Sequence, residues 1–472
     1  MDRNNIKPDD EYFIKRFFLT NNYIMKKQIS FCGNGLLATG VMTAGLVAAC
    51  TGTVKTGNTD KPNFIIIFTD DHGYNDLGCF GSETIETPRI DKMASEGIKM
   101  TSFYAQPVCG PSRGALLTGR YPLRIGGGWL TRSDEITIAE MMKDEGYATA
   151  CIGKWDISQR KYQEGLVPND QGFDYYFGTL GANDRGKVII YRNRDSLYLT
   201  EDMSSLTKMY TDEALEFIKK KKNEPFFLYL AHTMTHVVMD ASAQFKGKSR
   251  GELYGDVVEE IDWNVGRIMD LLTELRLDKN TYVFFFSDNG PWSNKEEFYR
   301  KTHGSKATGN AYPLRSAKGS PYEGGFRVPC VFWAPGNIPA GKVCNGMMAT
   351  LDIFPTIARL AGGVVSGDRV MDGYDQSDLI LGRTEVSARD IFYYHVKGEL
   401  QAVRKGKWKL VLPGTTMRYV YVLDPEREAP ELYDLEYDIS EQHNLADKYP
   451  DILKEMMDLA KNGPNDPANT GP

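Results

Sequence analysis

The chain has 472 residues, of which 41% are hydrophobic, 25% charged and 11% aromatic, and its formal net charge is −7 at pH 7. This is the composition of a globular protein with enough apolar residues for a large core. The charge is moderate and no block of basic residues occurs, which argues against nucleic-acid binding through a charged patch. We therefore expect no nucleic-acid partner.

Residues 1–60 have the features of a leader and not of a folded domain. From Met25 two lysines precede a small and apolar run, which matches the n-region and h-region of a secretory signal. The run ends in Val-Ala-Ala-Cys50, which resembles a bacterial lipobox, so we expect a lipid anchor on Cys50. Plain secretion and a retained membrane anchor are the alternatives. The prediction is an exported lipoprotein of the bacterial periplasm or outer membrane surface.

Residues 61–375 alternate short apolar runs with helical patterns. Strands are predicted at 64–68, 148–152, 225–231, 282–286 and 330–333. Helices are predicted at 89–97, at 136–146 with Ser133 as N-cap, and from near Cys109 to 119. This order favours a catalytic domain of the α/β class, a doubly wound and mostly parallel sheet with helices on both faces.

In residues 376–472 the alternation of strands and helices gives way to a series of short apolar runs. Short strands are predicted at 393–394, 401–403, 408–412 and 419–423, followed by a helix at 450–460. The tail 463–472 is rich in Pro, Asn and Gly and is expected to be mobile. We expect a smaller C-terminal α+β subdomain with a short antiparallel sheet.

Polar residues follow four of the predicted strands. Because ligands of open α/β sheets bind beyond the carboxyl ends of parallel strands, these side chains are expected to meet at one edge. Each group taken alone could instead cap a turn, since Asp and Asn favour turns. The residues are Asp70, Asp71, Lys154, Asp156, His236, Asp288 and Asn289.

Asp70, Asp71, Asp288 and Asn289 offer only oxygen atoms as ligands. Hard oxygen donors select Ca²⁺ or Mg²⁺ over zinc or copper, and adjacent carboxylates require a cation to offset their repulsion. No CxxC pair occurs that would support zinc.

The segment from Pro107 to Arg120 places a cysteine at a predicted helix N-terminus. Free backbone N–H groups and the helix dipole make such a position suitable for an anion. Arg113 follows Cys109 by four residues, so both side chains lie on one face of the helix. A buried hydrophobic cysteine is the alternative.

This segment carries a family resemblance. Cys109-Gly-Pro-Ser-Arg113, followed by Leu-Thr-Gly-Arg120, resembles the sulfatase signature, in which the cysteine is oxidised to formylglycine by a separate maturation enzyme. The segment 146–155 resembles the second signature, and Lys318 resembles the loop lysine of the family. The stretches 323–329 and 431–434 also match, so the resemblance extends from about residue 62 to about residue 446.

The resemblance implies a hydrolase of sulfate monoesters with one calcium ion, held by Asp70, Asp71, Asp288, Asn289 and the modified Cys109. Calcium and four cationic groups then bind the sulfate. One hydroxyl of hydrated formylglycine attacks sulfur with Asp288 as base, His236 or Lys318 protonates the alcohol, and the second hydroxyl expels sulfate. The cationic groups are Arg113, Lys154, His236 and Lys318.

Two features depart from the family pattern. Asp156 stands where a histidine usually follows Lys-Trp, a histidine assigned to sulfate release, and the loop around His236 lacks its usual prolines. The rival interpretations are a phosphatase or phosphonate monoester hydrolase of the same superfamily, and a non-catalytic lipoprotein that binds sulfated glycans.

Export points to a sulfated carbohydrate as substrate, by analogy. Loop residues that could contact a sugar, or could simply be solvated, are Asn183, Asp184, Arg185, Trp292 and His303. Of seven cysteines, Cys32 lies in the signal, and Cys50 and Cys109 have roles assigned above. The remaining four would allow two disulfides in three connectivities: Cys79, Cys151, Cys330 and Cys344.

Overall fold

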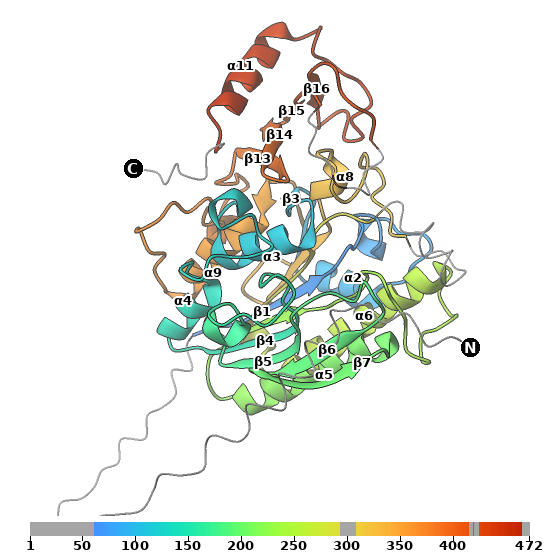
Figure 1. Cartoon of the computed structure of the whole chain (residues 1–472), viewed down its shortest axis with the longest axis vertical. Coiled ribbons are helices and arrows are strands. Elements are labelled where there is room, and N and C mark those ends of the chain that lie inside the picture. Colours follow the sequence, from blue (N-terminus) through green and yellow to red (C-terminus); the bar gives the residue numbers. More distant parts are fainter. Residues whose placement is uncertain (1–60, 293–307, 415–418, 420–423, 465–472) are drawn as a thin grey trace, which may run out of the picture. The chain divides into compact units, whose positions relative to one another are not determined.

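The computed structural model describes residues 61–292, 308–414, 419 and 424–464. A ten-stranded sheet forms its centre, in the order β11-β2-β10-β9-β1-β8-β4-β5-β6-β7 (Figure 1). The strands are β1 (Asn63–Thr69), β2 (Ile98–Met100), β4 (Ala148–Lys154), β5 (Tyr175–Thr179), β6 (Val188–Arg192), β7 (Asp195–Thr200), β8 (Phe226–Ala231), β9 (Thr281–Ser287), β10 (Cys330–Trp333) and β11 (Lys342–Cys344).

The middle of this sheet is parallel. β9, β1, β8, β4 and β5 pair in parallel, whereas β10 runs antiparallel to β9, and β6 and β7 form an antiparallel edge. The five strands predicted for the catalytic domain are all present, and the predicted mostly parallel α/β sheet is confirmed. The carboxyl ends of the parallel strands therefore meet at one edge of the sheet.

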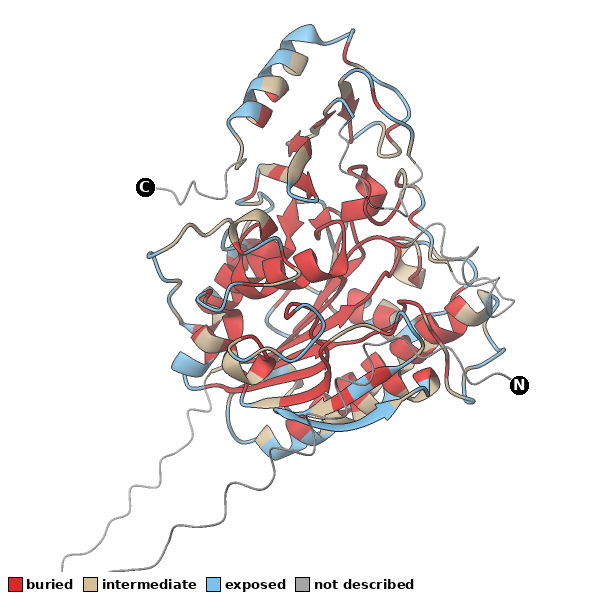
Figure 2. Ribbon diagram, viewed as in Figure 1, coloured by how far each residue is buried: buried red, intermediate tan, exposed pale blue. Residues whose placement is uncertain are grey.

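Helices cover both faces of the sheet, as the alternation along β1 requires. Phe64, Ile66 and Phe68 pack against one layer of helices, and Ile65 and Ile67 pack against the other. The first layer contains α3 (Cys109–Thr118), α4 (Ile138–Asp144) and α9 (Ile353–Ala361). The second contains α2 (Pro88–Ser95), α5 (Leu206–Lys221) and α6 (Glu252–Glu274). Figure 2 shows the central strands of the sheet buried between these helices, whereas the edge strand β7 is exposed.

The start of α4 corrects one prediction. Thr137, and not Ser133, is the N-cap: its hydroxyl accepts a hydrogen bond from Glu140 N–H at 3.2 Å, and the Glu140 carboxylate accepts one from Thr137 N–H at 2.8 Å. This reciprocal capping box satisfies two backbone donors at once, an advantage that Ser133 lacks because it stands too far from the first helical turn.

The C-terminal part forms a second, four-stranded antiparallel sheet, as predicted. Its strands are β13 (Ile391–Val396), β14 (Glu399–Lys405), β15 (Trp408–Val411) and β16 (Glu431–Asp434), and α11 (Pro450–Lys461) packs on it. The strand predicted at 419–423 falls largely outside the described residues, as does most of the tail predicted to be mobile. The fourth strand is formed by Glu431–Asp434 instead.

Shorter elements complete the fold: β3 (Phe103–Tyr104) pairs with β12 (Met348–Ala349), and α8 (Glu323–Phe326) and α10 (Ser377–Ile380) are single turns. The four cysteines considered for disulfides are free thiols, so neither bridge forms in the described structure. Across the described ranges, the helices are all too short or too polar to traverse a bilayer.

Candidate active site

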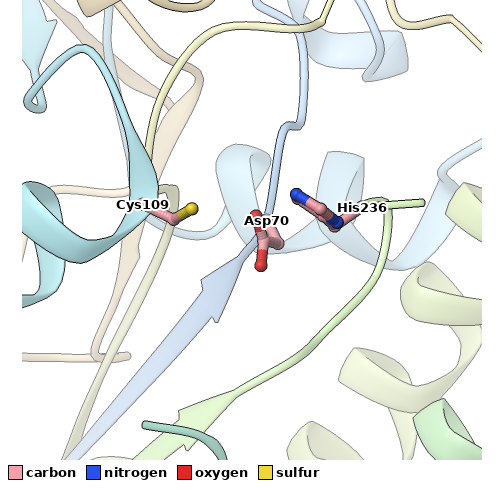
Figure 3. A group of neighbouring side chains, drawn as sticks. All are labelled: Asp70, Cys109 and His236. Carbon is pink, nitrogen blue, oxygen red and sulfur yellow. The ribbon is translucent and has the colours of Figure 1, made fainter. Parts of the chain in front are cut away.

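The polar residues predicted to follow the strands lie together at one edge of the parallel sheet. Asp70 and Asp71 follow β1, Asp288 and Asn289 follow β9, and Lys154 ends β4. His236 belongs to the loop after β8, and Figure 3 shows its ring, the Asp70 carboxylate and the Cys109 sulfur near one another. All of these side chains are buried.

Cys109 is the first residue of α3, as predicted. All ten residues of this helix are buried, and the Ser112 hydroxyl donates a hydrogen bond to the backbone oxygen of Asp288. This contact joins the helix to the end of β9. A side chain on Gly110 would lie 2.6 Å from the Trp129 ring, so close packing requires glycine beside the cysteine.

Three carboxylates form the centre of the site. Oxygen atoms of Asp70, Asp71 and Asp288 lie within 4.8 Å of one another, and the same limit holds for ligand atoms of Asp70, Cys109 and His236. Among the described residues, Asp70 Oδ1 and Asn289 Oδ1 receive no hydrogen bond although both are buried. Buried acceptors without donors cost free energy unless a ligand satisfies them, so this oxygen-rich set is suited to a hard cation.

Cationic side chains surround the carboxylates. Arg113 donates to Asp288 Oδ2 at 2.9 Å and to Asp70 Oδ2 at 3.3 Å, while Lys154 Nζ lies 2.6 Å from Asp70 Oδ2. Lys318 donates to Asp71 Oδ1 and lies 3.9 Å from Cys109 Sγ. The fixed positive charges around residue 109 are therefore arranged to bind an anion.

The electrostatics reflect this crowding. Burial raises the pKa of Asp288 to about 8, and repulsion from Asp70 adds to the effect. Burial alone would raise the pKa of Asp70, but Lys154, His236 and Arg113 hold it well below its usual range. Burial also raises the pKa of the Cys109 thiol to about 12 against the opposing charge of Lys154, so an unmodified thiol is neutral here and a poor nucleophile.

His236 is buried beside the carboxylates. Burial lowers the pKa of its ring, and the nearby Asp71 carboxylate opposes this shift. The Nε2 atom lies 4.0 Å from Asp71 and 3.7 Å from Asp184, and the ring packs against Trp292 with 6.0 Å between centroids. Trp292, one of the residues considered for sugar contact, therefore borders the catalytic groups.

Asp156 lies in the site, where it is paired with two cations. Its Oδ2 is 3.2 Å from Lys154 Nζ and its Oδ1 is 2.7 Å from Arg160 Nε. Burial would raise its pKa, but Lys154 and then Arg160 outweigh burial and lower it. The backbone of Asp156 is left-handed, with φ of 61°, as is that of Asp71 at 60°. Such strain in non-glycine residues is concentrated at functional sites.

Arg160 was missed by the sequence analysis. Its second contact is to Asp184, with 2.6 Å between Nη1 and Oδ2. The only sequence signal was its position four residues after Asp156, which is weak outside a helix. Asn183 donates to the backbone oxygens of His236 and Val238, which is a structural role. Arg185 is exposed, and His303 lies outside the described residues.

Comparisons with known proteins agree with this geometry. The model of the family described as "Sulfatase" matches residues 62–364, and that of "N-sulphoglucosamine sulphohydrolase, C-terminal" matches residues 317–462. The N-acetylgalactosamine-6-sulfatase of Canis lupus familiaris is 37% identical over 400 residues, 77% of this chain and 74% of that protein.

Two solved structures are similar over most of the chain. One comes from work on the "metabolism of multiple glycosaminoglycans" by Bacteroides thetaiotaomicron, with a TM-score of 0.75 and 27% identity, covering 85% of this chain and 99% of the other. The second is Ps i-CgsB in complex with k-i-k-neocarrahexaose, with a TM-score of 0.71 and 30% identity, covering 85% and 92%. The chain belongs to the sulfatase family of sulfuric ester hydrolases.

Proposed function

We propose that this sulfatase releases sulfate from a sulfated carbohydrate, with formylglycine made from Cys109 by a maturation enzyme and with one bound calcium ion. The observation that carries the proposal is the meeting of three carboxylates, three cationic side chains and Cys109 at the carboxyl edge of the parallel sheet. The two similar structures from glycan studies support the carbohydrate class.

The residues present fit calcium. Asp70, Asp71, Asp288 and Asn289 would hold the ion together with the modified residue 109, and the buried acceptors Asp70 Oδ1 and Asn289 Oδ1 are available to it. Loosely arranged carboxylate and amide oxygens suit calcium better than octahedral magnesium. When bound, calcium supplies positive charge that polarises the sulfate group.

Formylglycine, once hydrated, supplies the hydroxyl that attacks sulfur. Overall, water and the ester give an alcohol and sulfate as the bond between sulfur and the ester oxygen breaks. Arg113, Lys154 and Lys318 bind the sulfate oxygens and stabilise the charge that develops on them. His236 or Lys318 gives a proton to the departing alcohol, since both groups face the space beside residue 109.

Asp156 takes part in regenerating the site in this proposal. Held as a carboxylate by Lys154 and Arg160, it can accept a proton where relatives use histidine. Its negative charge near the sulfate is offset by the same two cations.

The deciding experiment measures sulfate and phosphate release from matched aryl esters, with mass spectrometry of residue 109. We expect sulfate release only, formylglycine in active protein, and turnover in Cys109→Ala lowered beyond detection. Cys330→Ala, which removes a buried thiol from β10, is the matched control and should keep its turnover. Phosphate release above sulfate release, or full activity in Cys109→Ala, would refute the proposal.

We propose further that the protein is exported and anchored to the membrane by lipid on Cys50. The support is the lipobox-like sequence, in residues outside the described structure. Mass spectrometry of the native N-terminus should find a lipidated Cys50, and Cys50→Ala should move the protein from the membrane fraction to the soluble fraction. An unmodified Cys50 in native protein would contradict this.

A further inference from the structure

A cavity of about 620 Å³ opens beside the catalytic groups. Its walls come from the end of β5 and the loop after it, from strands β6 and β7, and from Arg160. The catalytic scheme above uses none of this space. The lining residues that matter here are Leu180, Asp184, Arg185, Lys187, Ile189 and Leu199.

The cavity is joined to the site where the alcohol departs. Arg160, in its wall, bonds to Asp156, and the Asp156 N–H donates to the backbone oxygen of Leu180 at 3.2 Å. Asp184, also in its wall, lies 3.7 Å from His236 Nε2. His236 is one of the two groups proposed to protonate the leaving oxygen, so the cavity lies next to the place where the sugar on that oxygen would be held.

The charge of the wall differs from that of the chain. Arg160, Arg185 and Lys187 stand against the single carboxylate of Asp184, although the whole chain carries a net charge of −7. Arg160 is engaged by Asp156 and Asp184. Arg185 and Lys187 are exposed, and no salt bridge to another described residue neutralises either of them. Two cations thus remain available to an anion in the cavity.

Part of the cavity wall is apolar. Ile189 and Leu199 are cross-strand partners in β6 and β7, and their exposed fractions are 42% and 54%. Tyr191 also lines the cavity. An apolar lining with a few polar groups is typical of small-molecule sites, and the C–H faces of a sugar ring can pack against it.

We propose that this cavity binds the leaving sugar and that Arg185 and Lys187 bind a second anionic group on that sugar or its neighbour. This inference rests on the proposed sulfatase reaction and narrows its substrate to a polyanionic glycan. The second group is a carboxylate or a further sulfate, since both accept hydrogen bonds from Arg and Lys. Arg160 pairs with Asp156 of the catalytic site and with Asp184 of the cavity wall, so it fixes the boundary between the catalytic site and the cavity.

The test uses saccharides as competitive inhibitors of aryl sulfate hydrolysis by the mature, full-length enzyme. Three disaccharides of one backbone are compared: a uronic acid form, its carboxyl-reduced neutral form, and the neutral form with a sulfate added. We expect the inhibition constants of the anionic forms to be at least about tenfold lower than that of the neutral form, because two charge-assisted hydrogen bonds are gained. Which anionic form binds more tightly identifies the anion.

The double variant Arg185→Gln, Lys187→Gln should bring the three inhibition constants within about twofold of one another, since the charge-assisted bonds are then lost. The control Lys279→Gln removes an exposed lysine at the amino end of β9, opposite the site, and should keep the tenfold difference. Equal inhibition by neutral and anionic forms in the parent, or an unchanged difference in the double variant, overturns the cavity assignment while sulfatase activity stands. Absence of aryl sulfate hydrolysis would instead overturn the proposed function.

Discussion

Two buried clusters of charged residues lie in the described part of this protein, and they differ in how their carboxylates are paired. The catalytic cluster gathers Asp70, Asp71 and Asp288 with Arg113, Lys154 and Lys318 at the edge of the main sheet. The second, here called the closed cluster, joins α8 to the C-terminal sheet. It contains Glu323, Arg327, Arg404, Lys409 and Glu441.

In the closed cluster, both oxygen atoms of the central carboxylate, Glu323, accept hydrogen bonds. Glu323 Oε1 accepts from Lys409 at 2.9 Å and from Tyr394 at 2.8 Å, and Oε2 accepts from Tyr104 at 2.6 Å. Lys409 also lies 2.7 Å from Glu441. Burial would raise the pKa of Glu323, but Lys409 and Arg327 lower it to about 2.

The catalytic cluster instead holds carboxylates that repel one another and buried oxygen atoms that the described residues leave without a donor. A network of buried charges that are all paired contributes to one specific fold. Buried charges that lack partners destabilise the folded state, and a bound cation can remove that cost. The contrast teaches that burial of charge alone does not mark a functional site. Three carboxylates whose oxygen atoms converge within 4.8 Å of one another do.

The largest expected effect separates the clusters by activity. Asp288→Asn keeps the shape of the side chain and removes one carboxylate from the calcium site, so kcat/KM for an aryl sulfate should fall by at least about 10³-fold. The free energy of unfolding without calcium should not fall, because repulsion among the carboxylates is relieved. A variant that loses stability and activity in parallel would show that the two clusters do not differ in this way.

Glu323→Gln is the matched change in the closed cluster. It leaves Lys409 and Arg327 buried with less negative charge, so the free energy of unfolding should fall by roughly 3–5 kcal/mol. The turnover of the folded fraction should stay within a fewfold of the parent. Chemical denaturation followed by an aryl sulfate assay measures both, and a stable but inactive variant would place Glu323 in the chemistry.

Calcium removal sharpens the comparison by acting on one cluster only. Chelation should abolish sulfate release and, relative to calcium at about 100 times its dissociation constant, lower stability by about 2.7 kcal/mol. In Asp288→Asn the stabilisation by calcium should largely disappear, whereas in Glu323→Gln it should persist. Thermal unfolding with and without calcium measures this. Equal calcium stabilisation in the parent and Asp288→Asn would exclude Asp288 as a ligand.

The sequence predicted the frame of the site better than its details. Buried parallel strands are recognised in the sequence as apolar runs, and the residues that follow them lie at one edge of the sheet. The hydrophobic pattern was therefore enough to predict that four side chains meet there: Asp70, Lys154, His236 and Asp288. Helices α5, α6 and α9 were not predicted, although their buried apolar positions recur at helical spacing.

The role of Arg160 and the pairing within the closed cluster could not be predicted, because both depend on tertiary contacts. Arg160 reaches Asp156 only through a loop with left-handed backbone at residues 156, 159 and 160, which L-residues rarely adopt. Glu323, Lys409 and Glu441 lie 86 and 32 residues apart in sequence order, and nothing local relates them. The motif at 323–329 marked the family without revealing that its glutamate pairs with the C-terminal sheet.

Asp156 tests the proton transfer within the catalytic cluster. Asp156→Asn keeps the size of the side chain and removes its basic oxygen, so steady-state sulfate release should fall by roughly tenfold. A burst of alcohol release should precede the slow step, because sulfate transfer from the ester is intact. Asp156→His, which restores the residue usual in relatives, should recover the steady-state rate above that of Asp156→Asn. Unchanged kinetics in both variants would make Asp156 a bystander.

The smallest expected effect concerns Glu441 and the pH dependence of the closed cluster. Burial raises the pKa of Glu441 to about 7, and attraction to Lys409 opposes this shift. The folded state therefore retains a proton that the unfolded state has lost between about pH 4.5 and about pH 7, so the contribution of Glu441 to stability falls as pH rises through this window. Glu441→Gln removes this titration but preserves an acceptor for the Glu323 N–H, which bonds to Glu441 Oε2 at 2.8 Å. The difference in unfolding free energy between the parent and Glu441→Gln should shift against the parent by on the order of 1 kcal/mol from pH 5 to pH 8. Denaturation at several pH values measures it, and a difference that stays constant with pH would mean that Lys409 dominates and that Glu441 is ionised throughout.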